Sequence, residues 1–258
     1  MADPAKQLLV RVPGLELAES PSSWLSRTAL AQGVTTKELL KYLDFTHKGD
    51  VDLAVCRTNL NRLAAICGIS STRFRTVKRM FLGVSKLDRS GTRYLLSHGG
   101  TPRYRFCAAC VHEQPVKHFP LHWRFKAWRW CPTHNCMLDA VCPHCEAMVL
   151  LPRSLETAGP NGEGVATLGR CLVCGKKLST FHAEVRDLFD LDLLAPWEQP
   201  LLLNGRALLA ALYQGSFRVS KSEGAFSVGA IRRIERQGLL PHDHFKLDSA
   251  EYLRRSRV

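Results

Sequence analysis

Eight cysteine and histidine side chains in the middle of the chain stand in four pairs, and each pair is separated by two residues. The pairs are Cys107 with Cys110, Cys131 with His134, Cys142 with Cys145, and Cys171 with Cys174. A two-residue gap lets a tight turn point both side chains at one ion, and two such turns supply the four tetrahedral ligands that zinc prefers. Consecutive pairing therefore predicts two structural Zn²⁺ ions, the first bound by three cysteines and a histidine and the second by four cysteines.

Closed sites of this kind leave no position for a water nucleophile, which argues against a zinc hydrolase or deaminase. Two alternatives stay open within the pattern. Cys136 could replace His134 as the fourth ligand of the first site, although a gap of four residues after Cys131 is less usual. The pairs could also interleave, with the first pair joined to the third, but sequential pairing is simpler. Gly175 directly follows the last ligand, where a positive φ suits the turn.

Charge and cysteine content narrow the class of protein further. The 258 residues carry a formal net charge of +13 and a pI near 9.5, which favours polyanionic partners. Ten cysteines without an export signal indicate metal binding in a reducing compartment, because cytosolic thiols stay reduced. No apolar stretch reaches the roughly 20 residues of a membrane span. We expect a cytoplasmic, nucleoid-associated protein with no membrane partner.

The elements that must position these pairs fall into three segments. Residues 1–100 form an expected N-terminal helical domain with a helix–turn–helix, residues 101–185 a tandem zinc-finger region, and residues 186–258 a C-terminal helical domain with a possible second helix–turn–helix. The predicted fold class is thus a mainly α, small multi-domain protein, in which helix–turn–helix units flank two structural zinc fingers.

Helical periodicity is clearest in the first segment. Ser22 or Ser23 is a suitable cap for a helix that ends at Gly33, and a threonine at 35 or 36 caps the next helix. Residues 60–78 have the pattern of a helix–turn–helix, with the turn at Gly68 and a buried corner at Ile69. The second helix of this pair would expose four cations to a nucleic acid: Arg73, Arg75, Lys78 and Arg79. An ordinary helical hairpin with a solvated basic face is the alternative.

Aromatic and basic residues alternate between the two halves of the first zinc site. Trp123, Phe125 and Trp130 are predicted to form the core that a small zinc domain otherwise lacks. The interleaved cations are candidate nucleic-acid or partner contacts: Arg124, Lys126 and Arg129. In the last segment, apolar residues at helical spacing alternate with a second set of candidate contacts: Arg232, Arg233 and Arg236.

Several motifs together resemble a known family. They are Glu19-Ser20-Pro21-Ser22-Ser23-Trp24-Leu25-Ser26-Arg27, Arg105-Phe106-Cys107-Ala108-Ala109-Cys110, Cys131-Pro132-Thr133-His134 and Cys142-Pro143-His144-Cys145. In this order, over residues 10–180, they look like the TniQ/TnsD family, whose members select target sites for bacterial transposons. The resemblance implies an AAA+ ATPase transposition regulator as partner, together with target DNA or an RNA-guided CRISPR effector complex, and it allows a homodimer.

Catalytic motifs do not stand out beside these features. No Walker-type phosphate-binding loop and no acidic triad for two-metal chemistry appears in the sequence. We therefore expect no enzyme activity and no cofactor beyond zinc. Two rival hypotheses remain, a zinc-containing DNA-binding transcription regulator and a metal-dependent nuclease or deaminase, and the second conflicts with the closed sites.

Overall fold

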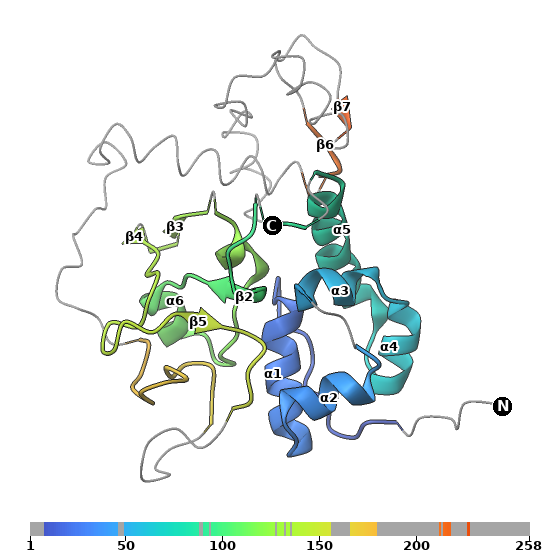
Figure 1. The fold of residues 1–258 in the computed structure, drawn as a ribbon, viewed down its shortest axis with the longest axis horizontal. Coiled ribbons are helices and arrows are strands. Elements are labelled where there is room, and N and C mark those ends of the chain that lie inside the picture. Colours follow the sequence, from blue (N-terminus) through green and yellow to red (C-terminus); the bar gives the residue numbers. More distant parts are fainter. Residues whose placement is uncertain are drawn as a thin grey trace.

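The computed structural model describes a helical N-terminal part followed by short strands (Figure 1). The described residues are 8–45, 49–87, 90–92, 94–126, 128–131, 133–134, 136–155, 166–179, 212, 214–217 and 226–227. The predicted contacts Arg232, Arg233 and Arg236, and nearly all of the predicted third domain, lie outside these residues. No helix in the described part is long and apolar enough to cross a membrane.

Five helices make up the first part. They are α1 (Pro21–Gln32), α2 (Thr36–Tyr42), α3 (Val51–Arg57), α4 (Leu60–Cys67) and α5 (Ser71–Leu87). Helix α1 is capped by Ser20 rather than by the later serines, because Pro21 fits the first helical position. Gly33 ends this helix in the left-handed conformation, and Thr35 caps α2 through a reciprocal capping box with Glu38.

Helices α4 and α5 form the predicted helical pair. Gly68 turns the chain between them with φ 62°, a conformation that glycine adopts without strain. Leu63, Phe74 and Val77 are buried between the pair and the other helices. Helix α5 continues to Leu87, past the expected helix end at Met80, because Phe81 and Val84 extend its buried face.

Short antiparallel strands follow the helices, so the fold is mixed rather than mainly α. Strands β1 (Ser97–His98), β2 (Thr101–Tyr104) and β5 (Val149–Leu150) form one sheet in the order β1-β2-β5. Strands β3 (Trp130–Cys131) and β4 (Cys136–Met137) form a hairpin, as do β6 (Ser216–Phe217) and β7 (Phe226–Ser227). Helix α6 (Ala108–Glu113) and the 3₁₀ helix η1 (Leu121–Arg124) lie between β2 and β3 in sequence. The expectation of a mainly α fold missed these strands, because all of them except β2 are two residues long and too short to show a periodic pattern.

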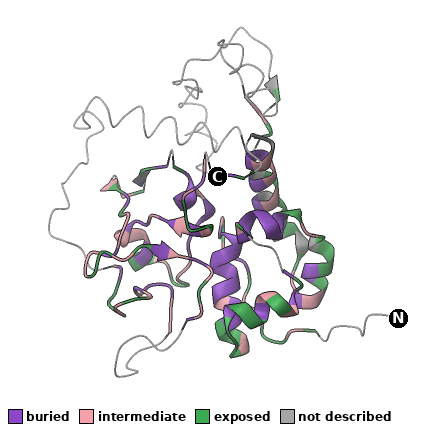
Figure 2. Ribbon diagram, viewed as in Figure 1, coloured by how far each residue is buried: buried purple, intermediate pink, exposed green. Residues whose placement is uncertain are grey.

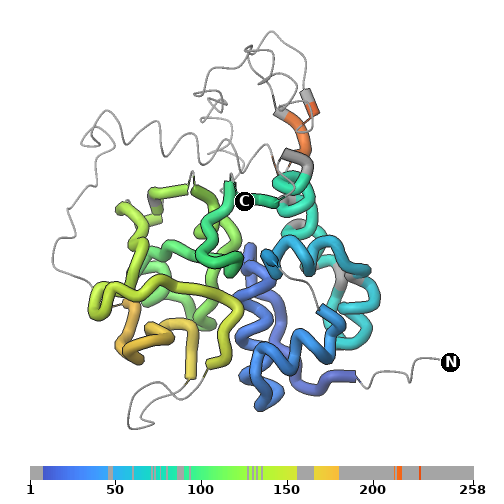
Figure 3. Tube along the Cα trace, viewed as in Figure 1, coloured from blue at the N-terminus to red at the C-terminus, as the bar shows by residue number. Residues whose placement is uncertain are grey.

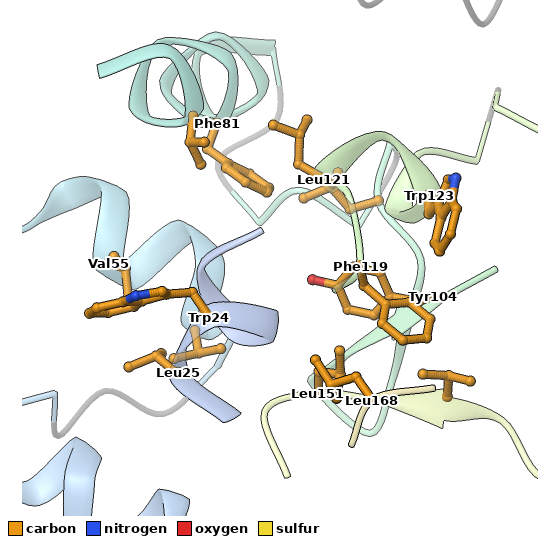
Figure 4. Packing of buried hydrophobic residues seen from close by; sticks show 14 of the residues in the cluster. Trp24, Leu25, Val55, Phe81, Tyr104, Phe119, Leu121, Trp123, Leu151 and Leu168 are labelled. Atoms are coloured by element: carbon orange, nitrogen blue, oxygen red, sulfur yellow. The ribbon is translucent and has the colours of Figure 1, made fainter. Parts of the chain in front are cut away.

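One hydrophobic core joins the helices to the strands. Trp24 packs edge-on against Phe74, with ring centroids 5.2 Å apart, on the helical side. Phe119 contacts Tyr104 and Trp123 on the other side, at 5.6 and 5.4 Å (Figure 4). Burial is concentrated along α1 and α3, where residues 21–26 and 51–56 are all buried (Figure 2). Figure 3 shows the segment 166–179, in gold, beside the segment that carries β5.

Candidate metal centres and basic surface

The first cluster gathers Cys107, Cys110, Cys131 and His134. Helix α6 supplies the first two, since Cys107 caps this helix and Cys110 lies in its first turn. Cys131 ends β3, and His134 lies in the turn before β4. The Nδ1 atom of His134 is 3.5, 3.2 and 3.6 Å from the sulfurs of Cys107, Cys110 and Cys131. The second nitrogen of this ring, Nε2, contacts the Glu113 carboxylate at 2.8 Å.

These separations fit a tetrahedral zinc ion. Zinc–sulfur bonds of about 2.3 Å and zinc–nitrogen bonds of about 2.0–2.1 Å place tetrahedral ligand atoms roughly 3.6–3.8 Å apart. The observed distances between donor atoms lie close to these values, and all four atoms lie within 4.8 Å of one another. A carboxylate on the outer nitrogen of a zinc-binding histidine is a common arrangement that orients the ring.

The second cluster gathers Cys142, Cys145, Cys171 and Cys174. Sulfur–sulfur distances are 3.8 Å from Cys142 to Cys174 and 3.6 Å from Cys145 to Cys171. The described residues therefore pair sequentially, and the interleaved alternative does not occur. Both turns bend sharply after the second ligand. Gly175 adopts φ 72° there, as the sequence predicted, and Glu146 adopts φ 58° at the equivalent position of the other turn.

The closely packed sulfurs of the first cluster shift one another's pKa values in opposite directions. Hydrogen bonds from Cys107, and then from Cys110 and Cys136, lower the pKa of the Cys131 thiol far below its ordinary value. Hydrogen bonding to Cys110, the largest cause, lowers the pKa of Cys107 to about 7. Hydrogen bonding to Cys107, the largest cause in each case, raises the pKa of Cys110 and of Cys136, so the thiols of this cluster do not all shift in one direction.

Two of the three aromatic residues predicted to form core are buried, and the side chain of the third, Trp130, lies outside the described residues. Trp123 and Phe125 are almost fully buried. The prediction that Arg124 contacts a nucleic acid is wrong, because its side chain is 0% exposed and cannot reach one. Its Nη1 atom donates to Asp52 Oδ2 at 2.5 Å and to Asp50 Oδ1 at 3.0 Å. Lys126 and Arg129, on either side of the buried Trp128, are exposed.

Buried polar groups around Arg124 tie the helices to the sheet. Asp52, on α3, accepts hydrogen bonds from the Tyr104 hydroxyl at 2.8 Å and from the Ser22 backbone at 2.6 Å. Burial lowers the pKa of Arg124, but the charges of Asp52 and Asp50 outweigh it and raise that pKa above its ordinary value. The guanidinium is therefore charged at every physiological pH.

The motif at residues 19–27 lies at the same junction. Glu19 is 0% exposed and pairs with Arg27 Nη1 at 2.5 Å. The Ser23 hydroxyl donates to Glu19 at 2.7 Å and accepts from the Phe119 backbone at 3.0 Å. The conspicuous serines of this motif therefore hold the two parts of the fold together, and they are not a surface for partners.

The predicted contacts on α5 partly reach the surface. Arg75 and Arg79 are exposed and Lys78 is half-buried, whereas the side chain of Arg73 lies outside the described residues. Arg79 donates to the Gln214 carbonyl at 2.7 Å, so it already holds a neighbouring segment.

Two further cations were missed by the sequence reasoning. Arg103 lies on β2 and Arg105 directly follows this strand. They alternate with Tyr104 and Phe106, which are buried in the core. Arg105 Nη1 donates to the carbonyls of Lys126 and Trp128, both at 3.1 Å. Burial, followed by the charges of Arg129 and Arg103, lowers the pKa of Arg105 to about 10. The alternation of Arg, Tyr, Arg and Phe over residues 103–106 is the period-two signal that could have revealed them.

Comparison with known proteins identifies a relationship over the first half of the chain. The sequence profile of the TniQ family matches residues 10–138. The match includes the five helices, β1 to β4 and the whole of the first cluster. Among curated proteins, no significant match to this chain is found.

Proposed function

The chain belongs to the TniQ family, and we propose that it is the adaptor that links a transposition machine to its target site. Family membership implies a role in transposition target selection, and the family is not known for enzymes. The match over residues 10–138 is the observation that carries this proposal. The adaptor acts through binding energy and geometry, and any ATP hydrolysis or DNA cleavage belongs to its partners.

Two structural zinc ions support this role by fixing the second half of the fold. Cys107, Cys110, Cys131 and His134 would hold one ion, and Cys142, Cys145, Cys171 and Cys174 the other. When bound, each ion would crosslink short segments that have little hydrophobic core of their own. The donor sets and their separations fit this use.

A cationic surface formed by Arg103, Arg105, Lys126 and Arg129 supports contact with nucleic-acid phosphates. Arg105 is fixed by two carbonyls, which orients its guanidinium before any ligand arrives. Arg103 Nε is buried and has no hydrogen-bond partner among the described residues. Clustered positive charges repel one another, and a bound anion relieves this repulsion. Phosphates of a DNA or RNA backbone are such anions, and they bind arginine through paired hydrogen bonds.

The α4–α5 pair supplies a second candidate contact. Arg75 lies on the exposed side of the first turns of α5, where a recognition helix meets base edges and phosphates. Lys78 and Arg79 continue this basic side. In this proposal the chain contacts target DNA, or the RNA-guided CRISPR effector complex bound to it. Other surfaces are left for the AAA+ ATPase regulator and for a second copy in a homodimer.

Recruitment of the ATPase tests this proposal. The AAA+ regulator of the same transposon would be mixed with immobilised duplex DNA, with and without this chain, and retained ATPase would be measured. We expect retention to increase at least tenfold when the chain and its target are both present. Equal retention with and without the chain, at saturating concentrations and with the CRISPR effector supplied in parallel, would contradict the adaptor role.

The α4–α5 pair also favours a second candidate, a zinc-containing transcription regulator. Such a protein would select one operator from a random duplex library and would not bind the ATPase. Selection of one sequence together with ATPase retention would instead identify an adaptor that reads its site directly.

A further inference from the structure

The first cluster contains a fifth donor. Cys136 begins β4, and its sulfur lies 3.7 Å from the Cys107 sulfur. This separation is that of two ligands on one tetrahedral zinc ion, roughly 3.8 Å for sulfur–sulfur pairs.

The strand register explains this position. Cys131 and Cys136 are direct partners across the β3–β4 hairpin. Directly opposed residues of an antiparallel pair project from the same face, with β-carbons about 4.5–5.5 Å apart. The hairpin that aims Cys131 at the ion therefore aims Cys136 at it too. His134, by contrast, lies in the connecting turn and is held from outside by Glu113, which is 62% exposed.

We propose that Cys136 is an alternative fourth ligand, so that the first cluster holds zinc with either His134 or Cys136 completing the set. The inference rests on the proposed zinc sites. Because a tetrahedral ion has four positions and Cys136 adds a fifth donor 3.7 Å from the Cys107 sulfur, one donor is always free. In the resting arrangement this is Cys136, because His134 Nδ1 lies within 3.6 Å of all three remaining sulfurs. When the imidazole leaves, Cys136 binds as thiolate and releases one proton to solvent, and the ion is retained.

Metal content of ligand variants tests this exchange. The full chain and its variants H134A, C136S and H134A/C136S would be purified, and bound zinc per chain measured. We expect two ions in the wild type and in each single variant, and one ion in the double variant. T133A, which changes an exposed residue of the same turn, is the matched control and should keep two.

Alkylation by N-ethylmaleimide, mapped by mass spectrometry, gives a second measurement that does not depend on the double variant folding. Cys136 should react in the wild-type protein and should be protected at least tenfold in H134A. One zinc ion in H134A, or equal Cys136 reactivity in both proteins, would overturn the inference while leaving the zinc sites in place. A wild-type chain without zinc would instead overturn the proposed sites themselves.

Discussion

The junction between helices and sheet is held together differently from the two clusters beyond it. At the junction, Trp24, Tyr104 and Trp123 are almost completely buried, and a charged network around Arg124 has all its carboxylates paired. In the second cluster, Cys145 is exposed and Val173 is 61% exposed. Side-chain burial stabilises the first region, whereas the proposed zinc ion would crosslink the second.

This difference separates two kinds of conspicuous sequence motif. Residues 19–27 and Arg124 attract attention as polar and basic residues, yet they fold the junction. The cysteine pairs indicate metal chemistry, and in the proposed zinc sites they would also serve folding. Residues available to partners are instead the exposed cations, including Lys126 and Arg129. Perturbing the two regions separately should therefore give distinct results.

Loss of a ligand from the second cluster should have the largest effect. Cys142→Ser should remove one zinc ion and unfold residues 142–179, because structural zinc contributes about 10–16 kcal/mol in finger peptides. Zinc content and limited proteolysis would measure this, with Val173→Ala as the control. Unchanged proteolysis of this segment in the zinc-depleted variant would show that burial stabilises both regions.

Arg124→Leu should break the junction and leave the clusters intact. Removing the cation leaves the fully buried carboxylate of Asp52 and the partly buried carboxylate of Asp50 without their partner, and breaking a buried ion pair typically costs about 3–5 kcal/mol. Chemical denaturation would measure the free energy of unfolding, and zinc content should stay at two. Lys126→Leu changes an exposed neighbour and should alter stability by less than about 0.5 kcal/mol. A similar small change in Arg124→Leu would contradict the role of the network.

The two turns of the second cluster should respond in opposite directions to glycine exchange. Gly175→Ala places a β-carbon at φ 72° and should destabilise the zinc-bound form by about 1–2 kcal/mol. Glu146→Gly removes such strain at φ 58°, so zinc should be retained more tightly against a chelator. Weaker retention in both variants would mean that the turns do not limit metal affinity.

The smallest expected effect is a pH dependence from His122. Burial, the largest cause, lowers the pKa of His122 to about 4, and its ring packs 5.0 Å from the Trp128 ring. A lowered folded-state pKa gives stability that is complete above the unfolded value near 6.5 and is lost as pH falls toward 4. Between pH 7.5 and 5.5 the wild-type protein should lose about 1 kcal/mol that His122→Gln does not lose. If the free energy of unfolding of the two proteins changes equally with pH, His122 is not the cause of the pH dependence.

Local spacing explains what could be predicted from the sequence. The cysteine pairs, the positive φ of Gly175 and the helical pair with its turn at Gly68 all depend on residues close in sequence. Arg124 was wrongly predicted to be exposed, because its partners Asp50 and Asp52 are more than 70 residues away in the sequence. The closeness of Cys136 to Cys107 likewise depends on the β3–β4 register and on how α6 packs against that hairpin, which no local pattern contains.

Binding to random duplex DNA at two salt concentrations tests the central claim most directly. The wild-type chain would be compared with Lys126→Ala/Arg129→Ala and with Lys37→Ala, which removes an exposed cation on α2. We predict affinity that falls steeply with salt, a logarithmic salt slope roughly 2 smaller in the double variant, and little change in the control. Salt-independent binding, or a double variant that binds like the wild type at both concentrations, would contradict the assignment of this surface to nucleic acid.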